Sequence, residues 1–266
     1  MMAYVGILGY GEVGIAIDEL YQLKDQHIVY TKDINSAAFN HWSPENISCL
    51  HVCIPFTDFD SFFSVLKEEI KSMPKLEIIL IHSTVAIRTI RSLYVLLNAD
   101  IDRSVISVVH APIRGQHETL AENIQNFVMY IGCLKNRDGQ YAAAIMKGLG
   151  VKTVATMQPP EATELGKLLD TTYYGLCIAF HAEVEKVCDH FQLNFHDVMT
   201  RFNTSYNAGY GDIDRFEVLR PTLYPPMNSK IGGHCIIPNA ELLKKDCLLD
   251  DVVNLILKYK GEEHGK

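Results

Sequence analysis

The sequence predicts an α/β protein, in which a doubly wound parallel sheet is followed by an all-α domain with one long helix. Apolar runs of strand length alternate with helical patterns through roughly the first 150 residues, as in doubly wound sheets. A glycine-rich pattern separates the first of these runs from the first helix. Between residues 161 and 191, apolar residues recur at helical spacing without a proline. We therefore expect a sheet domain over 1–155 and a helical domain over 156–266.

The expected strands are short apolar runs bounded by turn residues. They cover 3–9, 27–31, 50–56, 76–85, 105–112 and 127–133. The helices expected between them cover 15–23, 61–73 and 87–97. The helical domain should contain a helix over 161–191, a shorter one near 195–204 and a closing one near 240–260. The long helix exceeds what a small domain needs, so we expect two copies of the chain to pair along it as a homodimer.

The segment Gly9-Tyr10-Gly11-Glu12-Val13-Gly14 directly follows the first apolar run, and Asp33 stands 19 positions past Gly14. A glycine turn between a strand and a helix, followed by such an acidic residue, indicates a Rossmann-like dinucleotide site. Gly9 allows the tight turn, Gly11 lets the backbone approach the pyrophosphate, and Gly14 lets the helix pack closely. Asp33 would accept hydrogen bonds from the ribose hydroxyls, which favours NAD. Lys32 and Thr31 beside it leave room for NADP.

Ligands of doubly wound sheets bind beyond the carboxyl ends of the strands. The polar or ring-bearing residues at those ends are Pro55, Ser83, Thr84, His110 and Arg114. We expect Pro55, Ser83 and Thr84 near the cofactor, and His110 and Arg114 near the substrate. Ordinary loop polarity is the alternative explanation for each of them.

The long helix carries two further features. Glu161 and Glu164 fall in its first turns, where the helix dipole favours acidic residues. Lys167, Thr171 and Tyr174 share one helix face. Lys167 is either a functional cation in an apolar setting or a surface lysine that extends its ammonium into water.

Composition excludes several classes of function. The 266 residues are 48% hydrophobic and 21% charged, which is ordinary for a globular protein. A formal charge of −8 with scattered basic residues argues against a nucleic-acid partner. No segment reads as a signal peptide or a membrane span, so we expect a cytoplasmic protein without a membrane partner. The seven cysteines lack zinc spacing, and we expect them reduced and no metal site.

Cys235 differs from the other cysteines because glycines and no apolar periodicity surround it. It lies in SKIGGHCIIPNAELL, directly behind Gly232, Gly233 and His234. The glycines would let a thiol approach a bound substrate, and Pro238 would stiffen the loop behind it. A simple turn is the alternative.

Together, GYGEVG with Asp33, HSTV, ELGKLLDTTYYGLCIAFHAEVEKVC and above all GGHCIIP resemble the UDP-glucose/GDP-mannose dehydrogenase family. The resemblance follows the order of the chain over essentially its whole length. It implies a four-electron oxidation of a sugar-nucleotide alcohol to a carboxylate with two NAD, through a thiohemiacetal and a thioester. Cys235 matches the family's nucleophile, Lys167 its oxyanion-stabilising lysine, and Thr84 the threonine near the nicotinamide. Gly232, Gly233 and His234 would then contact the substrate, and polysaccharide biosynthesis is the family-level expectation.

The departures from the family pattern concern its active site. Thr171 stands where the family has an asparagine, and Asn239 where it has an aspartate. Ala111-Pro112-Ile113 replaces the segment that supplies an active-site glutamate. Asn239 can orient a water but cannot take its proton, so His110, Arg114 or His234 would have to compensate.

A second departure concerns length. The chain ends about where the family's nucleotide-holding third domain would begin, so either the substrate differs or a partner chain or second subunit completes the pocket.

Three functional hypotheses follow. The first is an NAD-dependent dehydrogenase that oxidises a small-molecule alcohol such as a nucleotide sugar through Cys235. The second is a two-electron β-hydroxyacid-type dehydrogenase, which shares the nucleotide domain, long helix and helix lysine but needs no cysteine. The third is a non-catalytic protein that binds NAD or a nucleotide sugar, which the two missing carboxylates favour.

Overall fold

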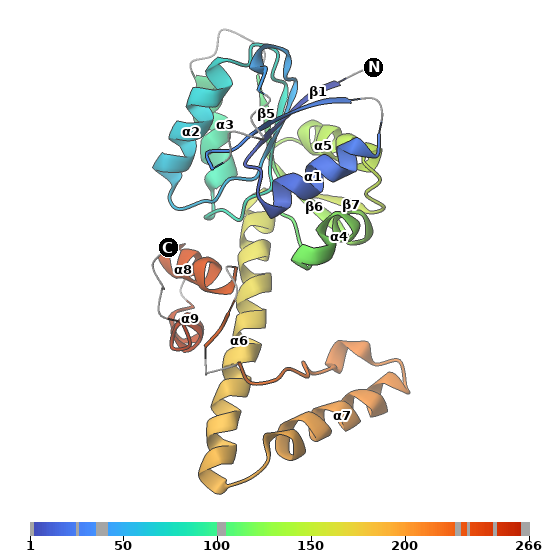
Figure 1. Ribbon diagram of the computed structural model, residues 1–266, viewed down its shortest axis with the longest axis vertical. Helices are drawn as coiled ribbons and strands as arrows, with labels where there is room; N and C mark the ends of the chain where they lie inside the picture. The colour runs from blue at the N-terminus through green and yellow to red at the C-terminus, as the bar shows by residue number, and fades with distance from the viewer. Residues whose placement is uncertain are drawn as a thin grey trace. The chain divides into compact units, whose positions relative to one another are not determined.

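A seven-stranded sheet forms the core of the first part of the chain (Figure 1). The computed structural model describes residues 3–24, 27–35, 42–99, 105–226, 230–232, 235–246 and 249–261. The strands are β1 (Ala3–Leu8), β2 (His27–Lys32), β3 (Cys49–Val52), β4 (Ile78–Ile81), β5 (Ser107–His110), β6 (Met129–Cys133) and β7 (Val154–Met157). Their order in the sheet is β2-β1-β3-β4-β5-β6-β7. The order reverses between β1 and β3, which is where doubly wound sheets bind their ligands.

The sheet is parallel except at one place. β5 and β6 pair antiparallel, with Val109 opposite Cys133 and His110 opposite Gly132. The expected α/β fold class is confirmed, but the sheet is mixed rather than wholly parallel. The reversal is possible because the connection from β5 to β6 contains only the short helix α4 (Leu120–Asn126) and turns, without a crossover to the other end of the sheet.

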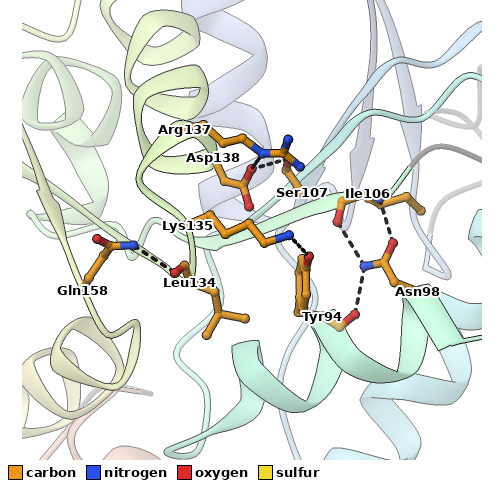
Figure 2. A network of polar contacts seen from close by, with 9 residues as sticks. All are labelled: Tyr94, Asn98, Ile106, Ser107, Leu134, Lys135, Arg137, Asp138 and Gln158. Carbon is orange, nitrogen blue, oxygen red and sulfur yellow. Dashed lines mark hydrogen bonds and ion pairs between the residues drawn. The ribbon is translucent and has the colours of Figure 1, made fainter.

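The reversal of β6 brings the start of helix α5 (Asn136–Gly148) to the amino-terminal end of β5. Figure 2 shows the polar contacts that join them there. Asp138 is buried and accepts a hydrogen bond from Ser107 Oγ at 2.9 Å, while Lys135 Nζ donates to the hydroxyl of Tyr94 at 2.5 Å. Asn98 bonds both backbone groups of Ile106. This network holds two helices at the amino-terminal end of β5. Ligands of such sheets bind at the carboxyl ends of the strands, so the role of the network is structural.

Helices cover both faces of the sheet (Figure 1). Helices α1 (Glu12–Gln22), α4 and α5 pack on one face around Ile17, Ile124 and Met146. Helices α2 (Phe59–Lys71) and α3 (Thr89–Ala99) pack on the other around Leu66 and Leu93. Each helix buries one apolar stripe, and the strands between the layers are buried on both sides.

Helix α6 runs from Glu161 to Phe191, as the apolar spacing predicts. The chain divides into two compact units, one ending at Lys167 and one beginning at Leu168, whereas the residue pattern places a boundary at 155. The first turns of α6 belong to the first unit because their side chains bond to it. Glu161 pairs with Arg91 at 2.6 Å, and Thr163 Oγ1 lies 2.9 Å from His110 Nδ1.

The second unit contains the rest of α6 and three further α-helices among the residues that the structure describes. A π-helical turn (His196–Thr200) leads into α7 (Arg201–Gly211). The expected closing helix is two helices, α8 (Ile236–Asp246) and α9 (Asp250–Leu257). Gly175 of α6 faces α8, where a Cβ would meet Ile236 Cγ2 at 2.5 Å, so a glycine is needed for this close packing. Three short 3₁₀ turns lie at Pro44–Asn46, His117–Thr119 and Phe216–Val218.

None of the helices in the described part of the chain combines the length and the apolar character required to cross a bilayer.

Candidate functional site

The glycine turn after β1 has the geometry that its sequence predicts. Gly9 has a φ of +93°, and a Cβ there would lie 2.7 Å from the backbone of Cys53, the residue that follows β3. A Cβ on Gly14 would lie 2.1 Å from the carbonyl oxygen of Gly9. Gly11 precedes α1 with a φ of −84°, and a Cβ there would meet nothing within 4 Å. Gly9 and Gly14 are therefore required by the fold itself, whereas the protein leaves space beside Gly11 for a ligand to approach the backbone.

Asp33 at the end of β2 faces the glycine turn. Its Oδ2 accepts the backbone N–H of Tyr10 at 2.7 Å, and its Oδ1 accepts that of Asn35 at 2.7 Å. The two bonds fix the carboxylate beside the turn.

Other residues of the motif have more local contacts. The Tyr10 hydroxyl donates to Asp18 at 2.5 Å, and burial together with this bond raises the pKa of Tyr10 to about 12. Glu12 is exposed in the first turn of α1, and Val13 is partly buried against the core. Lys32 pairs with Glu69 at 2.7 Å and lies 5.8 Å from the Trp42 ring.

A hydrogen bond joins the segments that follow β3 and β4, at the carboxyl ends of these strands. Ser83 Oγ donates to the carbonyl oxygen of Ile54 at 2.6 Å, next to the exposed Pro55. Thr84, the following residue, is partly buried. The hydroxyl of Ser83 is thus bonded within the protein, which leaves Thr84 as the side chain of this pair more available to a ligand.

His110 lies at the end of β5 and is fully buried. Its Nε2 lies 3.2 Å from the carbonyl oxygen of Ser83, which can only accept, so Nε2 carries the proton. Its Nδ1 lies 2.9 Å from Thr163 Oγ1, and that hydroxyl also lies 2.9 Å from the carbonyl oxygen of Pro160, to which it donates. Burial, with smaller contributions from His82 and Lys167, lowers the pKa of His110 to about 3. Both ring nitrogens serve the fold, which argues against the expected substrate contact and against proton transfer by His110.

Two more histidines form a buried chain that the sequence patterns did not indicate. His82 Nδ1 donates to the carbonyl oxygen of Ala111 at 2.7 Å, so its Nε2 accepts from His51 Nδ1 at 2.8 Å. His51 Nε2 then accepts from the Tyr21 hydroxyl at 2.8 Å. Burial lowers the pKa of His82 to about 4 and that of His51 well below its ordinary value. These two histidines and His110 each lie within an apolar run of strand length, and this shared position could have indicated buried histidines.

Arg114 also contacts its own domain. Its guanidinium donates to the carbonyl oxygen of Val128 at 2.9 Å and lies 5.0 Å from the Tyr130 ring. Ile113, at the position of the family's glutamate, is buried in the apolar core. Lys167 is the last residue of the first unit and is partly buried, one turn beyond Glu164 and near enough to His110 for its charge to affect that ring.

In the second unit, Cys235 is half-buried and stands at the start of α8. Its carbonyl oxygen accepts the N–H of Asn239 at 3.1 Å, the first bond of the helix. The partial positive charge at a helix N-terminus favours a thiolate at this position. Pro238 lies in the first helical turn, where a missing N–H costs little, rather than in a loop as we expected. A proline in such a place could have indicated the helix start.

Asn239 and Thr171 lie in contact. Asn239 is buried, and its Nδ2 donates to Thr171 Oγ1 at 3.1 Å, while Thr171 itself donates to the carbonyl oxygen of Leu168. The chain before Cys235 is also held, because Ile231 N donates to the carbonyl oxygen of Tyr259 at 2.9 Å. Gly233 and His234 lie outside the described residues.

A cavity of about 660 Å³ lies in the second unit. Tyr174 and Ile178 of α6 form one wall, Leu223 and Tyr224 another, and Lys230 and Gly232 a third. The walls are mostly apolar with one cation, and Gly232 is three residues from Cys235. Such a lining suits an organic molecule with an anionic group.

Within the described residues, no cluster of three or more His, Cys, Asp or Glu side chains has the arrangement of a metal site.

Sequence comparison finds two relatives, both UDP-N-acetyl-D-mannosamine dehydrogenases from strains of Methanococcus maripaludis. One is 26% identical over 159 residues, covering 60% of this chain and 33% of the relative. The other is 23% identical over 215 residues, covering 76% and 46%. The resemblance to nucleotide-sugar dehydrogenases is confirmed. No family model matches the chain. The chain spans between a third and a half of the length of these curated relatives.

Solved structures show the same fold at low sequence identity. UDP-D-ManNAc dehydrogenase from Pyrococcus horikoshii matches with a TM-score of 0.75 and 15% identity, over 97% of this chain and 68% of that one. The 3-hydroxyisobutyrate dehydrogenase of Mycobacterium tuberculosis matches with a TM-score of 0.67 and 12% identity, over 97% and 94%. The chain therefore has the fold of the UDP-D-ManNAc dehydrogenase and of the 3-hydroxyisobutyrate dehydrogenase.

Proposed function

We propose that this chain is an NAD-dependent dehydrogenase that oxidises the alcohol of a nucleotide sugar or a similar small molecule. The observation that carries the proposal is the glycine turn beside Asp33. There the protein leaves the backbone of Gly11 open and holds a carboxylate where an adenosine ribose would bind. The likeness to UDP-N-acetyl-D-mannosamine dehydrogenases supports the class of reaction and substrate.

NAD is the proposed cofactor in preference to NADP. A 2′-phosphate would meet the carboxylate of Asp33, and the neighbouring cation, Lys32, is paired with Glu69. Bound NAD would supply the hydride acceptor. Gly9, Tyr10, Gly11, Glu12, Val13 and Gly14 would hold its pyrophosphate, with Pro55, Ser83 and Thr84 towards its nicotinamide half.

Cys235 is the proposed nucleophile. After a first two-electron oxidation of the alcohol to an aldehyde, its sulfur would add to the carbonyl carbon to give a thiohemiacetal. Loss of a second hydride would leave a thioester, which water would hydrolyse to the acid. The start of α8 favours the thiolate that this addition needs. Lys167 would stabilise the oxyanion, as the resemblance implies.

Hydrolysis of the thioester is the step for which this chain differs most from the family. Asn239 can hydrogen-bond a water but cannot accept its proton. One N–H of its amide is already bonded to Thr171. Release of the acid from the thioester should therefore be slow relative to the two oxidations.

The cavity in the second unit is the proposed substrate pocket. The rings of Tyr174 and Tyr224 offer apolar faces, and the ammonium of Lys230 would pair with a phosphate or carboxylate. With Arg114 bonded to Val128 and His110 fully buried, Lys230 takes the anion-binding role that sequence patterns assigned to those residues.

Two copies of the chain are proposed to pair along α6. Exposed or half-buried apolar side chains recur along the helix at spacings of three or four, which places them on one side of it as in a coiled-coil seam. They are Leu169, Tyr173, Leu176, Phe180, Val184, Val187 and Phe191. The side chain of Phe180 is 52% exposed and that of Phe191 64%, so a second copy would bury considerable apolar surface.

A two-electron hydroxyacid dehydrogenase is the second candidate. 3-Hydroxyisobutyrate dehydrogenase has the same fold over 97% of this chain, with a TM-score of 0.67. The asparagine at position 239 also suits a reaction without thioester hydrolysis.

Product stoichiometry tests these candidates. The full chain is incubated with NAD and a panel of UDP-sugars, GDP-sugars and 3-hydroxyacids, and NADH formed per substrate consumed is counted. Two NADH from a nucleotide sugar supports the proposal, and one from a hydroxyacid supports the second candidate. No turnover despite NAD binding would indicate a binding protein. Cys235→Ser should stop the second oxidation, whereas Cys177→Ser, at a half-buried cysteine of α6, should not.

A further inference from the structure

Glu164 of α6 is a fully buried carboxylate. Its Oε2 accepts the backbone N–H of Arg88 at 2.6 Å, and its Oε1 accepts that of Ile90 at 2.7 Å. These N–H groups lie at the N-terminus of α3, which begins at Thr89. Glu164 thus bonds the start of a different helix with both oxygens, although its own helix would accommodate an acid there for local reasons.

The backbone that Glu164 holds has an unusual conformation. Arg88 has a φ of +74°, in the left-handed region that residues with a Cβ adopt at a cost. Such a conformation persists only where the surroundings determine it. The carboxylate supplies this constraint, because bonding Arg88 N and Ile90 N together requires the chain to turn sharply between them.

The segment from Ser83 to Arg88 begins near the carboxyl end of β4. It leaves β4 through Ser83, which is bonded to Ile54 of the β3 end, and through Thr84. His110 also donates to the carbonyl oxygen of Ser83. The segment is therefore fixed to neighbouring strands at its start and to Glu164 at its end. Thr84 lies between the two fixed points.

We propose that Glu164 is a positioning residue, which sets the backbone of the Ser83–Arg88 segment and so places Thr84 against the nicotinamide half of a bound dinucleotide. The inference rests on the proposed function, because it assigns to that cofactor site a residue that does not touch the cofactor. Only the ionised side chain can accept both N–H groups with full strength, since a protonated oxygen becomes a donor.

Protonation of Glu164 should therefore loosen the segment near neutral pH. Burial raises the pKa of Glu164 to about 7, against the two backbone hydrogen bonds. The charged or titratable groups around it are Glu161 and Lys167 on α6, Arg88 and Arg91 at α3, and His110 on β5. Pairing with Arg91 lowers the pKa of Glu161, and burial lowers the pKa of His110 to about 3, so neither titrates near neutrality.

The test compares Glu164→Gln with Glu161→Gln, which removes an acid one turn earlier and breaks only the ion pair with Arg91. NADH affinity is measured by fluorescence from pH 6 to 9, and amide exchange of Arg88 and Ile90 is measured without ligand. For the wild type we expect affinity to fall as pH drops through about 7. Glu164→Gln should weaken binding about tenfold at pH 8, remove this pH dependence and speed exchange at both amides. Glu161→Gln should change neither.

Arg88→Gly supplies the rescue, because glycine adopts a positive φ without cost. The double variant Glu164→Gln/Arg88→Gly should recover most of the lost NADH affinity. If Glu164→Gln alone does not fold, the double variant is measured in its place. Faster exchange in Glu164→Gln with unchanged affinity at every pH would reduce Glu164 to a helix cap and overturn the proposal. Unchanged exchange would show that Glu164 does not hold the backbone at Arg88 and Ile90, and would also overturn the proposal. A wild type that binds no NADH would instead refute the proposed function, and the exchange rates alone would then test whether Glu164 holds this backbone.

Discussion

Asn239 donates a hydrogen bond from Nδ2 to Thr171 Oγ1 at 3.1 Å, and these two residues occupy the positions at which the family has an aspartate and an asparagine. The two departures from the family pattern are therefore one contact. The Thr171 hydroxyl donates its own hydrogen bond to the carbonyl oxygen of Leu168, so it both donates and accepts. The pair links α8, which begins beside Cys235, to α6.

A double-mutant cycle on this pair should show coupling. Thr171→Val and Asn239→Ala should each destabilise the protein, and their effects should be non-additive by about 0.5–1.5 kcal/mol, as expected for one buried hydrogen bond. Urea unfolding of the four proteins measures this. Asn207, which bonds backbone groups of Arg220, provides a distant control whose change to Ala should add to Thr171→Val without coupling. Strict additivity at 171 and 239 would contradict the contact.

Gly11→Ala should separate cofactor binding from folding. A methyl group at Gly11 meets no protein atom and its φ of −84° suits alanine, so the melting temperature should stay within a degree or two. NADH affinity should fall more than tenfold because the methyl group occupies the approach to the pyrophosphate. Gly148→Ala, at another position with nothing within 4 Å, should change neither quantity. Full NADH affinity in Gly11→Ala would remove the glycine turn from the proposed site.

Asp33 should determine the preference between the two nicotinamide cofactors. We expect the wild type to bind NADH at least about tenfold more tightly than NADPH, because the carboxylate repels a 2′-phosphate. Asp33→Asn keeps an acceptor for one of the two backbone N–H groups, at Tyr10 or Asn35, and should narrow the preference. Fluorescence titration with both cofactors measures this. Lys32→Ala should leave the preference unchanged, and a wild type with equal affinities would contradict the assignment.

Acid should destabilise the fold through its buried histidines. The folded-state pKa values of His82 and His110 are about 4 and about 3, below the ordinary 6.5. Below pH 6.5 the unfolded chain therefore binds protons that the folded protein does not. Each histidine then removes up to about 1.4 kcal/mol of stability per pH unit until its folded pKa is reached. Glu164 acts in the opposite sense, because its raised pKa makes stability decrease as pH rises from 4.5 to about 7.

Unfolding in urea at pH 5.0 and 7.5 tests this expectation. His82→Asn preserves a donor towards Ala111 and should reduce the difference in stability between the two pH values. His196→Asn, at an exposed position, should leave the difference as in the wild type. An unchanged pH dependence in His82→Asn would show that this ring is charged in the folded state.

Phe180→Glu should separate a dimer into monomers. It introduces a charge at the centre of the apolar seam on α6, where two copies would bring like charges together. Light scattering coupled to gel filtration should then give half the wild-type mass. Asp189→Ala, on the exposed part of α6 outside the seam, should keep the wild-type mass. A wild type that is already monomeric at tens of micromolar would refute the proposed homodimer.

Local patterns were sufficient for most of the elements of the first unit, but they did not predict α4 or α5. Apolar runs between turn residues placed β1 to β6, and helical spacing placed α6 from Glu161 to Phe191, because burial of one stripe or of both strand faces selects those residues. Strand β7 was missed because Val154–Met157 is partly exposed and lacks a continuous apolar run. The antiparallel pairing of β6 with β5 was also not predicted, because the direction of a strand depends on how the preceding connection packs and not on the composition of the strand.

The glycine turn was predictable because its constraints are local. A positive φ at Gly9 and a 2.1 Å approach at Gly14 leave no room for any other residue type, so the pattern shows in the chain itself. Contacts between distant positions were not predictable in this way. Glu164 reads as an ordinary acid in a first helical turn, yet it bonds a segment more than 70 residues earlier. His110 reads as a loop residue at a strand end, yet both of its ring nitrogens are used by the fold.

Residue patterns thus predicted the glycine turn after β1 and the long helix, since each depends on neighbours within one or two turns of chain. Three-dimensional packing decided which polar residues are bonded within the protein. A buried polar atom must find a partner wherever the fold brings one, and that partner is often far away in sequence. For this reason Asn239 bonds Thr171, Glu164 bonds the start of α3, and His110 is buried with both ring nitrogens in contact with other parts of the fold.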